Sequence, residues 1–144
     1  MTRADDGVLL HVEVDGAPDA PLTVVFVHGY GASLGEWRYQ RAALAPHARL
    51  VLFDQRGHGR SGWTHPRRAT VDQLGQDLRA VVRDHAGGRP VVLVSHSLGG
   101  MAVLALVAER GELIGTTIRG VALLSTSAGR LAEVGVPAAV ARLL

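Results

Sequence analysis

Four short apolar runs, separated by stretches with helical periodicity, constrain the fold of this chain most strongly. They cover residues 22–27, 50–53, 91–94 and 121–124, and they are continuous and rich in Val and Leu. Strands that are buried on both faces of a parallel sheet have this pattern. Because helical patterns alternate with the runs, we expect a three-layer α/β/α fold around a mainly parallel sheet.

The segments between the runs carry signals of a peripheral strand and of helix ends. Residues 8–14 alternate apolar and polar side chains, which predicts a half-exposed strand at the margin of the sheet. Ser33-Leu34-Gly35-Glu36 and Thr70-Val71-Asp72-Gln73 have capping-box spacing, so a helix should begin at each. Gly87-Gly88 should end the second helix, and a third should cover about residues 97–110.

The composition excludes several classes of protein. Apolar residues make up 47% and charged residues 19% of the chain, as in globular domains. All fifteen basic residues are scattered arginines and the net charge is +2, so we expect no nucleic-acid partner. The absence of cysteine excludes disulfides and thiolate metal sites. The amino terminus lacks a secretory signal and no apolar run is long enough to span a membrane, so we expect a cytoplasmic location.

The third apolar run ends in a turn of small residues, Ser95-His96-Ser97-Leu98-Gly99. A serine on a sharp turn between a buried strand and a helix presents its hydroxyl at the sheet edge as a nucleophile. The residues two before and two after it should be small because they crowd each other. Gly99 meets this demand and Ser95 meets it less well, whereas Ser95 itself would have Leu93 at the earlier position. Ser97 is therefore the candidate nucleophile, and an ordinary serine N-cap is the alternative.

Two further loops follow the first two apolar runs. They are Val27-His28-Gly29-Tyr30-Gly31 and Asp54-Gln55-Arg56-Gly57-His58-Gly59-Arg60-Ser61. Together with the serine turn, these loops resemble the α/β-hydrolase superfamily in order and position, and in particular its lid-bearing serine hydrolases of actinobacterial type. The resemblance covers about residues 22–129 and implies a hydrolase fold.

The resemblance also implies a role for each residue of the site. Ser97 would attack an ester-like or other acyl carbonyl of a small molecule, and the backbone N–H groups of Tyr30 and Leu98 would form the oxyanion hole. The residues that would support these loops are His28, Gly29, Gly31 and Gly99. A serine at this position disfavours haloalkane dehalogenase and epoxide hydrolase chemistry, which uses aspartate there, and no metal or organic cofactor is implied.

Three histidines, His28, His58 and His96, lie in or beside these loops. A general base must reach the Ser97 hydroxyl within hydrogen-bonding distance. In the family the histidines of the first two loops are mostly structural, and the side chain of His96 should point away from that of its neighbour. We therefore assign the base to none of them. The resemblance likewise implies that Asp54 organises its own loop.

The catalytic acid and base of the superfamily are absent from the expected places. Both follow the nucleophile in the chain, but no histidine follows His96 and Glu133 is the only acid after the fourth apolar run. We expect residues 1–129 to form the amino-terminal part of a hydrolase core without its last strands, and residues 130–144 to begin a truncated lid helix. The strand at residues 121–124 should then be an uncovered edge that self-associates. Without the acid and the base, the rate of the catalysed reaction should drop to roughly 10³–10⁴-fold above that in water.

Three alternatives stay open. In the first, the chain is an inactive or degenerate homologue that acts through binding, if at all. In the second, a separate chain supplies the missing strands. The third alternative is a dinucleotide-binding domain, because glycines from Gly29 to Gly35 open a helix after a strand and Asp54 ends the next strand. Its glycine spacing is unusual, and it leaves the serine turn unexplained.

Overall fold

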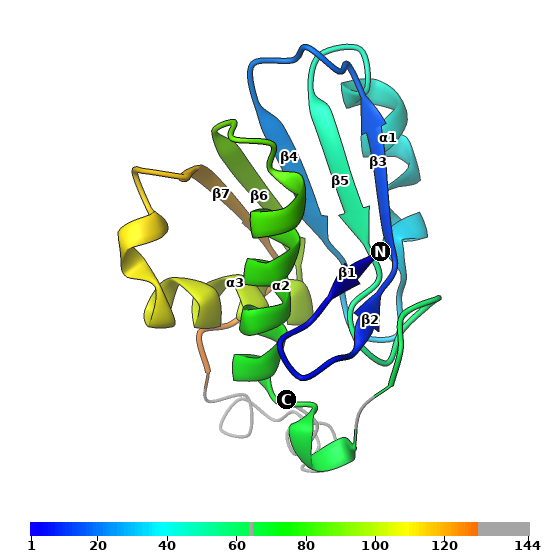
Figure 1. Cartoon of the computed structure of the whole chain (residues 1–144), viewed down its shortest axis with the longest axis vertical. Helices are drawn as coiled ribbons and strands as arrows, with labels where there is room; N and C mark the ends of the chain where they lie inside the picture. The colour runs from blue at the N-terminus through cyan, green and yellow to red at the C-terminus, as the bar shows by residue number, and fades with distance from the viewer. Residues whose placement is uncertain (64, 130–144) are drawn as a thin grey trace.

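A five-stranded sheet forms the middle layer of this computed structural model, which describes residues 1–63 and 65–129 (Figure 1). The strand order is β3-β5-β4-β6-β7. The strands are β3 (Val12–Gly16), β4 (Thr23–Val27), β5 (Arg49–Phe53), β6 (Val91–His96) and β7 (Ile118–Leu124). β4 to β7 are parallel and β3 is antiparallel to β5, which confirms the mainly parallel sheet and the peripheral strand. A separate hairpin pairs β1 (Thr2–Arg3) with β2 (Leu9–Leu10).

Helices lie on both faces of the sheet (Figure 1). One face is covered by α2 (Val71–His85) and α3 (Leu98–Glu109). The opposite face is covered by α1 (Arg38–Leu44) and by the 3-10 turn η1 (Leu34–Trp37) that precedes it. Two more 3-10 turns are η2 (Pro66–Arg68) and η3 (Gly111–Leu113). This is the three-layer α/β/α fold that the alternation of apolar runs and helical patterns predicts.

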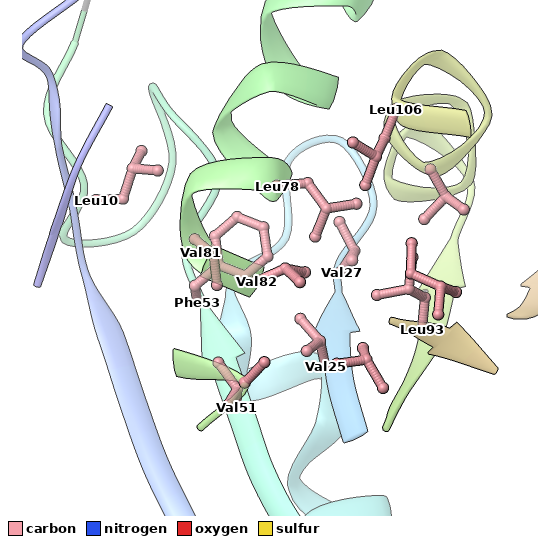
Figure 2. Close-up of a cluster of buried hydrophobic side chains, with 14 of the residues drawn as sticks. Leu10, Val25, Val27, Val51, Phe53, Leu78, Val81, Val82, Leu93 and Leu106 are labelled. Carbon is pink, nitrogen blue, oxygen red and sulfur yellow. The ribbon is translucent and has the colours of Figure 1, made fainter. Parts of the chain in front are cut away.

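The side chains of the central strands alternate between the two helical layers. On β4, Val25 and Val27 pack with Leu78 of α2, as Figure 2 shows. The intervening Phe26 points the other way and stacks against Trp37, with 5.1 Å between the ring centroids. Because both faces are apolar and covered, the strand reads as a continuous apolar run rather than as an alternating one.

The expectation that both faces of every apolar strand are covered is wrong for β6 and β7, at the other end of the sheet. Leu93 of β6 is buried, but its neighbours Val92 and Val94 are only half-buried. On β7, Val121 and Leu123 are 39% and 45% exposed. Within the described part of the chain β7 is an outer strand, and only its first residue, Ile118, is buried in the core with residues of α2 and α3. The exposed edge expected at residues 121–124 is therefore present.

One of the two predicted capping-box segments supplies the N-cap of an α-helix where expected. Thr70 caps α2, and its hydroxyl accepts a hydrogen bond from the Gln73 N–H at 3.2 Å. At the other, the Ser33 hydroxyl accepts from the Gly35 N–H, and a 3-10 turn forms first. The Glu36 carboxylate does not return to the Ser33 N–H, as a capping box requires, because it binds elsewhere.

No helix within residues 1–63 and 65–129 has the length and apolar character needed to cross a bilayer. The lid helix that the sequence predicts for residues 130–144 lies outside the described residues, so that prediction stays untested.

Candidate active site

Ser97 occupies a strained turn between the end of β6 and the start of α3. Its φ is 49° and its ψ is −115°, a conformation that costs a non-glycine residue roughly 1–3 kcal/mol. Its backbone is held from both sides, because the Ser97 N–H donates to Leu124 O at 2.9 Å and Ser97 O accepts from Thr126 Oγ1 at 2.7 Å. Its side chain makes no capping hydrogen bond to α3. The geometry is not that of an ordinary serine N-cap, which has an extended backbone and a side-chain capping bond.

The small residues on either side of Ser97 serve different purposes. Ser95 is fully buried and its hydroxyl donates to Ala122 O on β7 at 3.1 Å, so it is closed to substrate. A Cβ at Gly99 would lie 2.7 Å from His28 O and nearer still to Val27 O. The expected crowding between positions 95 and 99 is therefore not what demands glycine here. The demand comes from the loop after β4.

That loop lies directly against the serine turn. A Cβ at Gly29 would be 3.4 Å from the Ser97 Cβ and 2.9 Å from His96 Nδ1, so a side chain at Gly29 would separate the two loops. Within residues 1–63 and 65–129, neither the Tyr30 N–H nor the Leu98 N–H has a hydrogen-bond acceptor. These two backbone donors thus directly follow the residues at which the loops meet, because Tyr30 follows Gly29 and Leu98 follows Ser97.

His28 has no nitrogen available for catalysis. Its ring is fully buried; Nδ1 donates to Gly29 O at 2.8 Å, and Nε2 accepts from the Gln55 N–H at 2.9 Å. Burial lowers the pKa of His28 below its usual value, which favours the neutral ring that these partners require. His28 therefore ties the loop after β4 to the loop after β5.

His58 supports the same loop from outside. Its Nε2 accepts from the Gly31 N–H at 3.1 Å, its Nδ1 donates to Arg56 O at 3.0 Å, and its ring lies edge-on to Tyr30 at 5.6 Å between centroids. Both nitrogens are occupied, as in His28. Two of the three candidate histidines are thus structural, in agreement with the expectation from the sequence.

Asp54 also organises loops rather than facing a ligand. Its two carboxylate oxygens accept from the Leu34 N–H and the Arg60 N–H, each at 2.8 Å, and its side chain is buried. A dinucleotide site would need this carboxylate free for a ribose hydroxyl. The arrangement therefore counts against the dinucleotide alternative.

A buried ionic group that sequence reasoning missed fixes the loop after β5. Arg56 contacts Asp77 of α2 through Nε and Nη2, both at 2.6 Å, and its Nη1 donates to Asp6 at 2.8 Å. Burial raises the pKa of Asp77, although the hydrogen bond from Arg56 acts in the opposite direction. At Asp6 the hydrogen bond from Arg56 lowers the pKa. The signal in the sequence is an acid at position 77 within the apolar stripe formed by Leu74, Leu78 and Val81.

Glu36 is a second residue that the sequence analysis placed in the wrong role. Its Oε2 accepts from the Gly29 N–H at 2.9 Å, and its Oε1 lies 2.5 Å from His96 Nδ1. The capping-box pattern assigned this carboxylate to Ser33. Only the fold shows that it reaches the two loops around Ser97.

A mainly parallel sheet with a strained serine turn where a strand meets a helix defines a hydrolase-type α/β protein. The sequence profile of the alpha/beta hydrolase fold matches residues 23–140, so the chain belongs to this family.

Several proteins that have different functional names are similar to this chain. "Probable oxidoreductase EphD" of Mycobacterium tuberculosis (strain ATCC 25618 / H37Rv) is 38% identical over 104 residues, which are 72% of this chain and 17% of that protein. Epoxide hydrolase 1 of Caenorhabditis elegans is 32% identical over 108 residues, which are 74% of this chain and 26% of that protein. The "X-ray crystal structure of a putative aryl esterase from Burkholderia cenocepacia" matches with a TM-score of 0.79 at 32% identity, over 88% of this chain and 46% of that one. This chain thus spans 17% to 26% of the length of the two curated relatives.

Proposed function

We propose that this chain carries the nucleophile and the oxyanion hole of a serine hydrolase that cleaves an ester-like or other acyl bond in a small molecule. The observation that carries the proposal is the positive φ of Ser97 at the end of β6, with no capping bond from its hydroxyl. Protein backbones retain such strain chiefly where function requires it. The N–H groups of Tyr30 and Leu98, which have no acceptor among residues 1–63 and 65–129, support the same role.

In the proposed reaction, Ser97 Oγ forms a bond to the acyl carbon while the carbonyl π electrons move to oxygen. The Tyr30 and Leu98 N–H groups donate to this oxygen, and each such donor is worth about 3 kcal/mol in the transition state. Leu98 lies at the N-terminus of α3, where the helix dipole also favours negative charge. Collapse of the intermediate releases the leaving group and leaves an acyl-serine, which water then hydrolyses.

The proton of the Ser97 hydroxyl needs a base, and within residues 1–63 and 65–129 no hydrogen bond joins this hydroxyl to one. His28 and His58 use both ring nitrogens, and His96 lies against Glu36. We propose that the base and its orienting acid come from polypeptide outside these 144 residues. The greater length of the relatives supports this assignment.

A second candidate is a homologue that does not catalyse and acts through binding. It is favoured by the same observation that no base is hydrogen-bonded to the Ser97 hydroxyl within residues 1–63 and 65–129. An epoxide-opening reaction has less support, although Epoxide hydrolase 1 is a relative, because residue 97 is a serine and that chemistry uses a carboxylate nucleophile.

Labelling with a fluorophosphonate separates the two candidates, because this probe reacts with an activated serine. We expect wild-type protein to be phosphonylated at Ser97, slowly but faster than after denaturation. Ser97→Ala should abolish labelling, whereas Ser95→Ala, a matched change two residues away, should retain it. Wild-type labelling no faster than in denatured protein, or equal labelling of Ser97→Ala, would contradict the proposed function.

Two expectations from the sequence remain proposals. One is a cytoplasmic location. The other is self-association of two copies of this chain through β7, supported by the exposed apolar side chains Val121, Leu123 and Leu124 on this outer strand.

A further inference from the structure

The Glu36 carboxylate touches both loops that carry the proposed catalytic groups. Its Oε2 accepts from the Gly29 N–H, one residue before the Tyr30 donor. Its Oε1 lies 2.5 Å from the Nδ1 of His96, one residue before Ser97. The alignment at His96 falls outside hydrogen-bond geometry, so this second contact is a close approach of the carboxylate to the ring.

Glu36 itself is held in place by its own short element. The next residue, Trp37, is buried in the core and stacks against Phe26. At the start of η1, the Leu34 N–H donates to the buried Asp54 carboxylate at 2.8 Å. The Glu36 side chain is three-quarters buried. Its carboxylate is therefore a rigid support rather than a mobile surface charge.

The two contacts act on the position of one backbone donor. The Gly29 N–H and the Tyr30 N–H belong to successive peptide units, so fixing the first restricts the orientation of the second. An oxyanion donor is effective only when it points at the place where charge develops. A misplacement of about 1 Å in such a group can cost up to roughly 100-fold in rate.

We propose that Glu36 is a positioning residue that holds the loop after β4 against the serine turn and so orients the Tyr30 N–H toward the acyl oxygen. This inference rests on the proposed function of Ser97. Gln at position 36 can still accept from the Gly29 N–H, whereas Ala cannot.

The test compares Glu36→Ala and Glu36→Gln with wild type in two readouts. The first is phosphonylation of Ser97 by a fluorophosphonate, separated into its maximal rate constant and its half-saturating concentration. Glu36→Ala should lower the maximal rate about 10- to 100-fold and leave the half-saturating concentration unchanged. The second is hydrogen exchange of the Gly29 amide, which should accelerate about 10-fold in Glu36→Ala. Glu36→Gln should restore both readouts to near the wild-type values.

Glu112→Ala is the matched control, because Glu112 is also a glutamate in a 3-10 turn with one ionic partner, Arg110 at 2.6 Å. It should leave both readouts unchanged. The inference is overturned if Glu36→Ala is phosphonylated at the wild-type rate, or if Glu36→Gln does not restore the two readouts. If wild-type protein is not phosphonylated at Ser97, the proposed function fails instead. The hydrogen exchange of the Gly29 amide still tests the contact with Glu36, and an unchanged exchange rate in Glu36→Ala would overturn it.

Discussion

Replacing Gly99 by alanine should push apart the two loops that form the candidate site. The added Cβ would lie 2.7 Å from His28 O, and Val27 O is nearer still. Both obstacles are backbone atoms, so no side-chain rotation relieves the contact. Because Gly99 lies in the first turn of α3, the strain falls between the loop after β4 and the helix that carries Leu98.

The size of the effect follows from these distances. Ordinary van der Waals contact begins at 3.4 Å, so His28 O must move by at least ~0.7 Å and Val27 O by more. Overpacking of this kind costs typically 1–3 kcal/mol of folding free energy. The displacement falls on the loop that carries the Tyr30 N–H, so the rate of Ser97 phosphonylation should fall by roughly 10- to 100-fold.

Two measurements on the same variant check this reasoning. Equilibrium unfolding in urea gives the loss of stability, and fluorophosphonate labelling gives the change in the reactivity of Ser97. Gly111→Ala is the control, because a Cβ at Gly111 meets no atom within 4 Å, so it should lose less stability than Gly99→Ala and label at the wild-type rate. A Gly99→Ala protein as stable and as reactive as wild type would refute the close approach of the two loops.

Two more predictions concern stability and assembly. The free energy of unfolding should decrease as the pH falls below 6.5, because burial lowers the pKa of His28 in the folded state and the unfolded chain then binds more protons. Urea unfolding at several pH values measures this decrease; it should be weaker in His28→Gln, and equal decreases in both proteins would disprove the assignment. Leu123→Lys, on the exposed edge of β7, should reduce self-association measured by sedimentation velocity. A wild-type chain that is monomeric at high micromolar concentration would remove the basis for this prediction.

The sheet was predictable where both of its faces are covered. The apolar runs at β4 and β5 are continuous because Val25 and Phe26 enter opposite helical layers, so the burial of each residue is visible in the sequence itself. For β7 the same pattern gave the wrong burial. An apolar run records which residues favour burial, but the layers that cover a strand are set by the rest of the fold.

The candidate site likewise contains residues that the sequence could predict and residues that it could not. The serine turn and the histidine-glycine loop are local motifs, so Ser97 and Tyr30 could be proposed as site residues from the sequence alone. Glu36 and Arg56 could not, because their partners lie 7 to 60 positions away and depend on which loops the sheet brings together. For Glu36 a plausible local pattern, the capping box with Ser33, also competed with its actual contacts.

The exposed strand β7 is part of the candidate site as well as an edge of the sheet. The strained backbone of Ser97 is held by Leu124 O at the end of β7 and by the Thr126 hydroxyl just after it. Ser95, on the strand that leads to the turn, also donates to β7 through Ala122 O. A strand or partner that pairs with the outer edge of β7 would restrict its motion, and through the bonds from Leu124 and Thr126 it would also fix the conformation of Ser97. Pairing at this edge should therefore change the reactivity of the serine as well as the state of association.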